Sequence, residues 1–380
     1  MNLKPKKILI VAGEASGDMH AANLVHKLLA TNKNLQIDAV GGTCLSKIKE
    51  VNMLNMLAEH GVIGFVAVLT HAFILRKAYT KITQHMRENR PQLVILVDFP
   101  GFNLRLAKCA KDLGLKVLYY ISPQVWAWKA KRINHIKKYV DHMAVVLPFE
   151  KAIYQKENIP CSFVGHPILS HLINMETQEA RSYLNLPQNN KIIALLPGSR
   201  KSEIKRHMPV LVQTIMQLNK HIADLKFILP LAPTISRQQL TPYLNKGIKN
   251  LKIIQGETQQ AIKASDFVIV ASGTASLESA LLLKPMCIIY KVSIISSMIV
   301  GKVVKIRYAG LCNLIAGSML VPELLQYDCT ADTLTNLVLC YLTDLKLAET
   351  LVNKLKTLKQ TLTLAKADLP LETLVTNLLP

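Results

Sequence analysis

Short apolar runs alternate with longer amphipathic stretches along almost the whole chain of 380 residues. Five or six consecutive apolar residues are typical of a strand that is buried on both faces, whereas the intervening stretches have the periodicity of helices. The predicted strands of the first half are residues 7–12, 93–97, 117–121, 143–147 and 162–164. Those of the second half are residues 191–196, 226–229, 252–254, 267–271 and 286–290.

Strands that alternate with helices predict parallel sheets with crossover helices, and the two series predict two Rossmann-like α/β domains. The sequence Gly-His-Pro at residues 165–167 ends the first series, so we expect a hinge near residues 165–175. The C-terminal part of the chain has a helical pattern without a strand signal. We therefore expect an N-terminal Rossmann-like domain over residues 1–168, a C-terminal one over residues 169–345, and a helical segment over residues 346–380 that packs back across them.

The formal net charge is +21, from 46 Lys and Arg against 25 Asp and Glu. Such an excess implies an anionic partner: nucleic acid, an acidic membrane surface or phosphorylated substrates. The basic residues are dispersed and no nucleic-acid-binding motif accompanies them, which weighs against nucleic acid. The mean hydropathy is +0.24, yet no stretch is long enough to span a bilayer.

The cysteines and the first apolar run indicate in which cellular compartment the protein is expected. The seven cysteines form no Cys-x-x-Cys pair, which indicates reduced thiols. The first run reads as a strand and not as a signal peptide, so we expect a cytoplasmic protein. Neither His-Glu-x-x-His nor Asp-x-Asp occurs in the sequence, so no metal site is expected.

Two apolar runs of the second half end in turns that suit a phosphate. The residues of these turns are Gly198, Ser199, Arg200, Ser272, Gly273 and Thr274. Backbone N–H groups at a helix N-terminus favour phosphate, and Arg200 adds a fixed charge that suits a diphosphate. Glu278 lies one turn into the following helix, where a carboxylate can accept hydrogen bonds from ribose hydroxyls. The second half is therefore predicted to bind a nucleoside diphosphate.

In open α/β sheets, ligands bind beyond the carboxyl ends of the strands. Asp98 directly follows five apolar residues. A partly buried carboxylate there would have a raised pKa and could take a proton from a hydroxyl, although an Asp that caps the next turn is the alternative. Asn103 belongs either to the same site or to the N-cap of a helix expected over residues 104–113.

Other polar and aromatic residues lie beyond strand ends as well. Glu14 and Asp18 either bind substrate hydroxyls or complement a helix N-terminus. Trp126 and Trp128 share one loop, where stacking on a sugar or acyl chain is the alternative to core packing. His166 in the Gly-His-Pro corner is a structural histidine or a weak site candidate.

Two apolar segments bear on membranes. Residues 62–75 are almost wholly apolar and are followed by Arg76, Lys77 and Lys81, and residues 299–307 mix apolar with cationic side chains. The first segment is too short to cross a bilayer, and a buried core helix is one interpretation of it. Together with the net charge, interfacial binding to anionic lipid explains both segments better.

Motifs in the same order over nearly the whole chain carry a family resemblance. They are residues 13–18 (GEASGD), 98–103 (DFPGFN), 122–128 (SPQVWAW), 147–150 (LPFE), 196–200 (LPGSR) and 271–278 (ASGTASLE). Together they resemble the lipid-A-disaccharide synthase family. The resemblance implies the GT-B architecture, in which two Rossmann-like domains face each other across a cleft, and an inverting glycosyltransferase activity.

The reaction that the resemblance implies joins UDP-2,3-diacylglucosamine to 2,3-diacylglucosamine 1-phosphate (lipid X). Its products are a β-1,6-linked disaccharide 1-phosphate and UDP. The family is peripheral on the cytoplasmic face of the Gram-negative inner membrane and can form C-terminally swapped dimers. The implied partners are therefore the two lipid substrates, an anionic membrane surface and a second copy of the chain, without nucleic acid, cofactor or metal.

The resemblance also implies roles for single residues. The residues that it assigns to UDP are Arg200, Ser272, Gly273, Thr274 and Glu278, with Tyr290 and Asn313 nearby. It makes Asp98 the base of the acceptor site, with Glu14 and Asn103 beside it, although spacing alone does not separate Asp98 from Glu14. The chain departs from the family at Cys312, where Pro is common, and at residues 65–68, which are apolar where an acidic residue is frequent.

Rival interpretations stay open at this point. Another GT-B enzyme, such as a UDP-GlcNAc 2-epimerase or a peptidoglycan glycosyltransferase, would also carry two phosphate turns. A dependence on lipid substrates distinguishes the disaccharide synthase from an epimerase. A basic lipid- or nucleic-acid-binding protein is the alternative outside enzymes, and salt-dependent DNA binding without sugar-nucleotide turnover would favour it.

Overall fold

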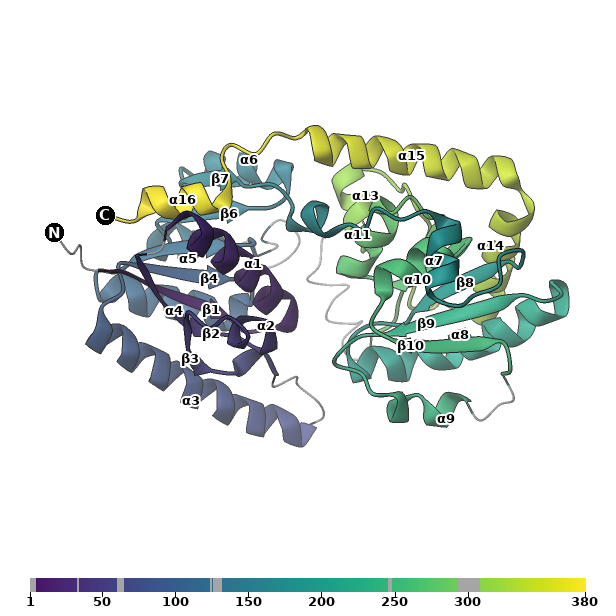
Figure 1. The fold of residues 1–380 in the computed structure, drawn as a ribbon, viewed down its shortest axis with the longest axis horizontal. Coiled ribbons are helices and arrows are strands. Elements are labelled where there is room, and N and C mark those ends of the chain that lie inside the picture. The colour runs from purple at the N-terminus through teal and green to yellow at the C-terminus, as the bar shows by residue number, and fades with distance from the viewer. Residues whose placement is uncertain are drawn as a thin grey trace. The chain divides into compact units, whose positions relative to one another are not determined.

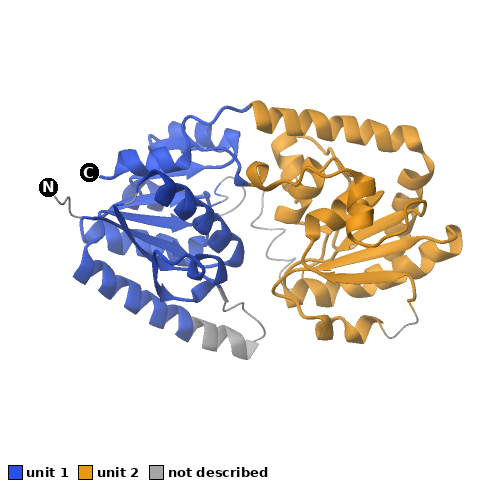
Figure 2. Ribbon diagram, in the orientation of Figure 1, with its two compact units in different colours: residues 1–167, 365–380 blue, residues 168–364 orange. Residues whose placement is uncertain are grey.

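The computed structural model of the chain describes residues 5–32, 34–59, 65–123, 125, 132–244, 248–292 and 308–380, without the side chains of residues 59 and 65–72. These residues form two compact units, shown in Figure 2. Unit 1 comprises residues 1–167 together with residues 365–380, and unit 2 comprises residues 168–364. The chain therefore passes between the units twice, and its C-terminus belongs to the same unit as its N-terminus.

Unit 1 is built on a parallel sheet with the strand order β3-β2-β1-β4-β5-β6-β7 (Figure 1). Its strands are β1 (Lys6–Ala12), β2 (Leu35–Val40), β3 (Val51–Asn55), β4 (Leu93–Val97), β5 (Lys116–Tyr120), β6 (His142–Val145) and β7 (Cys161–Phe163). Its connecting helices are α1 (Ala15–Thr31), α2 (Thr43–Ser46), α3 (Phe65–Asn89), α4 (Pro100–Asp112), α5 (Arg132–Tyr139) and α6 (Pro148–Lys156), with the 3-10 turn η1 (Leu57–Glu59). All residues of β4 are buried, because helices cover both faces of the sheet.

Unit 2 is built on a second parallel sheet, with the order β10-β9-β8-β11-β12-β13. Its strands are β8 (Ile192–Leu196), β9 (Lys226–Leu231), β10 (Leu251–Gln255), β11 (Phe267–Ala271), β12 (Met286–Tyr290) and β13 (Glu323–Leu325). Its helices are α7 (Thr177–Tyr183), α8 (Lys201–His221), α9 (Thr241–Leu244), α10 (Thr258–Ala264), α11 (Thr274–Leu281), α13 (Leu311–Ala316), α14 (Ala331–Thr343) and α15 (Leu345–Leu364), with the 3-10 turns η2 (Pro167–His171) and η3 (Arg237–Gln239). Alternate residues of β8 enter two apolar clusters, one with α10, α11 and α15 and the other with α8 and α14.

Two parallel sheets with crossover helices confirm the predicted pair of Rossmann-like domains. The sequence pattern did not reveal β2, β3 and β13. The strand β2 includes the polar residues Gln36 and Asp38, β3 includes Asn52 and Asn55, and β13 has only three residues. These three strands lack the continuous apolar run that made the central strands visible.

The C-terminal residues 346–380, which we expected as one helical segment, are divided between the units. The helix α15 lies in unit 2, and α16 (Leu371–Leu378) lies in unit 1. Asp368 attaches the returning chain to the edge strand β7: its N–H donates to the carbonyl of Phe163 at 2.8 Å, and its carboxylate accepts the N–H of Phe163 at 2.8 Å. Lys151 pairs with the same carboxylate at 2.6 Å. The tail therefore satisfies backbone groups that an edge strand would otherwise leave open.

The strand order of each sheet reverses at its centre. In unit 1, β1 lies between β2 and β4, and in unit 2, β8 lies between β9 and β11. Crossover helices leave such a point towards opposite faces, which opens a crevice at the carboxyl ends of the two central strands. The segments that follow β1, β4, β8 and β11 are therefore the places where each unit is best able to bind a ligand.

Candidate functional site

The crevice of unit 1 is formed by the turns that follow β1 and β4. These strands are paired in register up to Ala12 and Val97, so Glu14 and Asp98 leave the sheet at the same edge. The ring of Phe99 packs over Gly13 so closely that a Cβ atom at this position would collide with it. A glycine is therefore required where the first turn passes the second.

Asp98 lies in a constrained turn at this edge. Asp98 and Phe99 both have left-handed backbones, with φ of 46° and 49°. The N–H of Asp98 donates to the carbonyl of Tyr120 at 2.9 Å, and its own carbonyl accepts the hydroxyl of Tyr119 at 2.6 Å. The residue is half-buried at this edge of the sheet.

Asn103 contacts the turn that carries Asp98 and is not the helix N-cap, which was the alternative interpretation. The helix α4 begins at Pro100 with Phe99 as its N-cap, so Asn103 lies inside the first turn and is not a cap. Its side chain is 0% exposed, and its amide donates to the carbonyls of Val97 at 3.1 Å and Asp98 at 2.8 Å. A side chain without exposed surface cannot contact a ligand, so Asn103 acts on the turn that carries Asp98.

Glu14 and Asp18, which were expected either to bind substrate hydroxyls or to complement a helix N-terminus, differ in their surroundings. Glu14 is the N-cap residue of α1, but its side chain makes no capping hydrogen bond, and the residue is half-buried at the edge of the crevice. Asp18 is buried and accepts the N–H groups of Gly42 and Cys44, each at 2.7 Å. Asp18 therefore complements the N-terminus of α2, whereas the Glu14 side chain does not cap α1.

The turn after β8 differs from the simple phosphate loop that we expected. Gly198 has a left-handed φ of 121°, and a Cβ atom there would collide with Glu203. The Glu203 carboxylate accepts the N–H groups of Ser199 at 2.9 Å and Arg200 at 3.1 Å. These amides, which we expected to face a phosphate, therefore have an internal partner in the structure. Sequence reasoning missed Glu203, although a Glu three residues after a helix N-cap is a recognised capping signal.

Arg200 itself is at the surface of this turn. Its side chain is 62% exposed, and its Nη1 atom lies 3.2 Å from Oε1 of Glu203. The ion pair therefore attaches the end of the side chain to the first turn of α8, and the side chain lies at the protein surface. A guanidinium stays charged at every physiological pH and can bind a phosphate through two parallel hydrogen bonds.

The turn after β11 is more open. Gly273 is the N-cap of α11, and both Gly273 and Thr274 are exposed. Within the described ranges, the N–H groups of Gly273, Thr274 and Ala275 donate to no other group of the protein. Amides at a helix N-terminus with the dipole behind them attract an anion, so this turn suits an anion better than the turn after β8.

Glu278 lies behind this turn and is held by a neighbouring helix. Nε2 of Gln259 donates to Oε1 of Glu278 at 3.0 Å, while Oε1 of Gln259 accepts the N–H of Ile173 at 2.8 Å. Burial raises the pKa of the Glu278 carboxyl, and the bond from Gln259 acts in the opposite direction. Gln259 therefore orients a carboxylate that can accept hydrogen bonds from a ribose, and the sequence alone did not reveal it.

Ser272 has an internal role that connects the turn to a neighbouring loop. Its hydroxyl donates to the carbonyl of Ala309 at 2.7 Å. The Glu323 carboxylate in β13 accepts the N–H groups of Ala309 at 2.7 Å and Gly310 at 2.9 Å. Glu323 therefore determines where the loop lies and, through it, the position of the Ser272 hydroxyl. Nothing in the sequence pattern indicated this residue.

Asn313 completes the same network from inside the protein. The residue is buried; its amide nitrogen donates to the carbonyl of Val321 at 2.8 Å and to Oε1 of Glu323 at 2.7 Å. Its Oδ1 atom accepts the N–H groups of Leu320 at 2.8 Å and Val321 at 2.9 Å. An Asn side chain has two donors and two acceptor positions, so these bonds use its full capacity. Asn313 therefore orders the loop next to the candidate UDP site.

Tyr290 ends β12 beside a buried histidine. Burial raises the pKa of Tyr290, so its hydroxyl is a neutral donor. Nε2 of His207 accepts the N–H of Lys291 at 2.9 Å, which places the ring proton on Nδ1, where it donates to the carbonyl of Pro197 at 2.6 Å. Burial also lowers the pKa of His207. A neutral histidine therefore connects the turn after β8 to the end of β12.

Comparison with known proteins identifies the family. The family described as Lipid-A-disaccharide synthetase matches residues 8–371. Lipid-A-disaccharide synthase 1 of Legionella pneumophila is 46% identical over 376 residues, which cover 98% of both chains. The enzyme of Coxiella burnetii is 36% identical over 375 residues, which cover 98% of this chain and 99% of that protein. The chain belongs to the lipid-A-disaccharide synthase family.

Solved structures with the same architecture include other sugar-nucleotide enzymes. UDP-GlcNAc 2-epimerase from Neisseria meningitidis, bound to UDP-GlcNAc, has a TM-score of 0.66 over 98% of this chain and all of that chain, at 14% identity. A glycosyltransferase of kitacinnamycin has a TM-score of 0.62 over the whole of both chains, at 11% identity. Likeness at this identity shows the fold alone, and it confirms the GT-B class that the resemblance to the synthase family implied.

Several predicted features lie outside the described residues. They are Trp126, Trp128, residues 299–307 and the first part of the apolar segment 62–75. His166 is described, and burial, followed by the nearby His20, lowers its pKa to about 4, so the ring is neutral. No helix in the described ranges has the length and apolar character that crossing a membrane requires.

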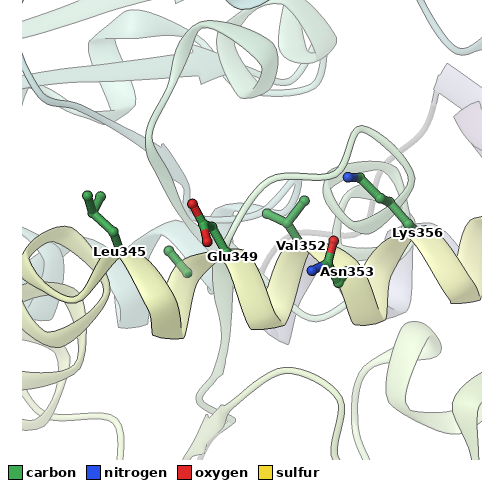
Figure 3. Close-up of a pocket in the computed structure, with 6 residues that line it drawn as sticks. Leu345, Glu349, Val352, Asn353 and Lys356 are labelled. Carbon is green, nitrogen blue, oxygen red and sulfur yellow. The ribbon is translucent and has the colours of Figure 1, made fainter.

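A surface hollow on α15 is separate from the residues assigned to the synthase site. It has a volume of about 390 Å³ and is lined along one side of the helix, as Figure 3 shows, by Leu345, Ala348, Glu349, Val352, Asn353 and Lys356. None of these is a predicted site residue. In the part of the chain that the structure describes, no three His, Cys, Asp or Glu residues come together as metal ligands would.

Proposed function

We propose that the protein transfers 2,3-diacylglucosamine from UDP-2,3-diacylglucosamine to the 6-hydroxyl of lipid X. The products are the β-1,6-linked lipid A disaccharide 1-phosphate and UDP. The observation that carries the proposal is 46% identity to a lipid-A-disaccharide synthase over 98% of both chains. Residues with the chemistry of this reaction lie at the central crevice of each sheet, which supports the same assignment.

Unit 1 supplies the base in this proposal. The Asp98 carboxylate accepts the proton of the acceptor's 6-hydroxyl while the oxygen attacks the anomeric carbon of the donor. The bond between this carbon and the β-phosphate oxygen of UDP breaks with its electrons on the phosphate, and the anomeric configuration inverts. Glu14 lies at the same sheet edge and binds a hydroxyl of the acceptor sugar.

Unit 2 binds the donor's UDP in this proposal. The accessible guanidinium of Arg200 and the open amides of Gly273 and Thr274 neutralise the diphosphate, which gains negative charge as the bond breaks. Glu278 accepts the ribose hydroxyls, held in place by Gln259. Fixed cations and amides perform the neutralisation that a divalent ion performs in other glycosyltransferases, so we propose a reaction that requires neither metal nor cofactor.

We further propose that the protein works at the cytoplasmic face of the inner membrane, where both lipid substrates can reach it. Phe73 on α3 is 69% exposed, and Arg76, Lys77, Lys81 and Arg87 on the same helix are exposed as well. Their spacing places them on one helix face. An exposed aromatic ring among cationic side chains suits an anionic lipid surface, and the net charge of +21 favours it over the whole protein. A homodimer is a further proposal, which mass photometry in detergent tests.

The assay mixes the purified protein with UDP-2,3-diacylglucosamine and lipid X in detergent with EDTA present. Formation of the disaccharide 1-phosphate and UDP is expected, and it tests the reaction and its metal independence together. A reaction that needs added divalent ion would refute metal independence alone. If UDP-GlcNAc is epimerised and no disaccharide forms, the function is that of the epimerases with the same fold.

Single substitutions separate the roles of the two units. Asp98→Asn is expected to abolish turnover and to leave UDP affinity unchanged, because UDP is bound by residues of unit 2. Glu14→Gln is the matched comparison, since it also neutralises a carboxylate at this edge. If Glu14→Gln abolishes turnover and Asp98→Asn does not, the base is Glu14.

A further inference from the structure

The turn that carries Asp98 has an unfavourable backbone conformation. Asp98 and Phe99 are consecutive residues with a Cβ atom, and both have a left-handed φ, of 46° and 49°. A Cβ atom makes this region costly, so two such residues in succession persist only where neighbouring groups hold them. The direction of the Asp98 side chain depends on this turn, because φ and ψ determine where the Cα–Cβ bond points.

Two buried side chains hold the carbonyl oxygen of Asp98. The hydroxyl of Tyr119 in β5 donates to it at 2.6 Å, and the amide of Asn103 in α4 donates to it at 2.8 Å. Both side chains are 0% exposed. The donors reach one oxygen from a strand and from a helix, so the peptide plane after Asp98 has little freedom to rotate.

The Tyr119 hydroxyl and the Asn103 amide are both held in the orientation in which they donate to the carbonyl of Asp98. Burial raises the pKa of Tyr119 well above its ordinary value, and the charge of Asp98 adds to this, so the phenol keeps its proton. Asn103 also donates to the carbonyls of Val11 at 3.4 Å and Val97 at 3.1 Å. Val11 belongs to β1 and Val97 to β4, the two strands on either side of the crevice. Its Oδ1 atom accepts no hydrogen bond from the described residues, so its amide nitrogen, and not its oxygen, determines its orientation.

We propose that Tyr119 and Asn103 are positioning residues that hold the Asp98 carboxylate in the orientation required for proton transfer. The inference rests on the proposed role of Asp98 as the base. It assigns no contact with substrate to either residue, since both are fully buried. A carboxylate that is displaced by a fraction of an ångström still permits substrate binding but transfers the proton poorly.

The test compares Tyr119→Phe with Tyr79→Phe. Both substitutions remove one phenolic hydroxyl from unit 1, where Tyr119 lies in the apolar core and Tyr79 is partly buried against it. The Tyr79 ring packs edge-on against Phe102, with a centroid distance of 6.1 Å, and its hydroxyl does not bond to Asp98. For Tyr119→Phe we expect kcat to fall by between about 10-fold and 100-fold, with KM for both substrates and UDP affinity unchanged. For Tyr79→Phe we expect kcat within about twofold of the unmodified protein.

Thermal melting distinguishes positioning from a general loss of structure. A purely structural role of Tyr119 would lower the melting temperature and leave kcat per folded enzyme unchanged, which contradicts the proposal. Asn103→Ala removes the second donor and is measured in the same way, so the proposal stays testable if one variant does not fold.

Asp98→Asn in the same series separates this inference from the proposed mechanism. If Asp98→Asn is inactive while Tyr119→Phe and Asn103→Ala both keep kcat within about twofold, the positioning role is refuted and the base assignment stands. If Asp98→Asn retains normal turnover, the base assignment fails and the positioning role fails with it.

Discussion

Glu323 offers the sharpest test of how unit 2 is organised, because one carboxylate there accepts three donors. They are the N–H groups of Ala309 at 2.7 Å and Gly310 at 2.9 Å, and the amide of Asn313 at 2.7 Å. Glu323→Ala leaves all three without an acceptor. A buried donor that loses its partner costs about 1 to 3 kcal/mol, but Glu323 is half-buried and water can replace part of the loss. We therefore expect the free energy of unfolding of unit 2 to fall by about 2 to 4 kcal/mol.

Glu323→Gln is expected to lower the free energy of unfolding less than Glu323→Ala does. A glutamine oxygen in place of Oε1 still accepts Gly310 and Asn313, whereas the new NH₂ group faces the N–H of Ala309. One unsatisfied contact in place of three predicts a loss of about 1 to 2 kcal/mol. Glu349→Ala is the control, because it removes an exposed carboxylate from the surface of α15 and should change stability by less than about 0.5 kcal/mol.

Three measurements compare these variants. Urea unfolding gives the order of stability, and hydrogen exchange reports on the loop, where the amides of Ala309 and Gly310 should exchange faster in Glu323→Ala. UDP affinity should fall as well, because the hydroxyl of Ser272 depends on the carbonyl of Ala309. If these amides exchange as slowly in Glu323→Ala as in the unmodified protein, the carboxylate does not hold the loop and the reasoning fails.

Further predictions concern charge. Arg200→Ala should weaken UDP binding by about 10- to 100-fold, since a charge-assisted contact is worth roughly 1.5 to 3 kcal/mol, and calorimetry that shows unchanged affinity would remove Arg200 from the site. Burial raises the pKa of Asp368, but Lys151 and the edge of β7 lower it overall to below its ordinary value of 3.8. This carboxylate therefore stabilises unit 1 fully above that value and loses its contribution as the pH falls through the lower folded-state pKa. The stability difference between the unmodified protein and Asp368→Asn should accordingly shrink in acid, and a difference that is constant with pH would contradict this. Arg76→Glu combined with Lys77→Glu should reduce sedimentation of the protein with anionic vesicles and leave turnover in detergent unchanged. If the double variant sediments with the vesicles as well as the unmodified protein does, α3 is not the membrane-binding surface.

The central strands could be predicted from the sequence because each one contains five consecutive apolar residues. β1, β4, β8 and β11 are buried on both faces, and their carboxyl ends were correctly expected to carry the polar turns of each unit. The strands β2, β3 and β13 could not be predicted in the same way. In β2, for example, the buried Asp38 accepts hydrogen bonds from Asn52 and His85, at 2.7 Å and 3.0 Å, so a polar residue occupies a core position. A pattern of apolar residues cannot show a buried polar group whose partners are distant in the chain.

Motifs indicated which turns matter, but not what each residue in them does. The amides of Ser199 and Arg200 suit a phosphate by sequence, yet Glu203 accepts both in the structure. Asn103 has the residue type of a binding group, yet it is 0% exposed. In each case the deciding fact is the distance to a partner, and the sequence contains no distances.

The sequence by itself determined the two parallel α/β sheets and the family, because buried apolar runs and ordered motifs are properties of the chain read in one dimension. Only the tertiary structure decided which polar residues face a ligand and which hold the backbone. Tyr119 lies 21 residues from Asp98, and Glu323 lies 51 residues from Ser272, so their roles arise from strand pairing and loop packing. Hydrogen bonds depend on positions within a few tenths of an ångström, and such positions exist only once the sheets have formed.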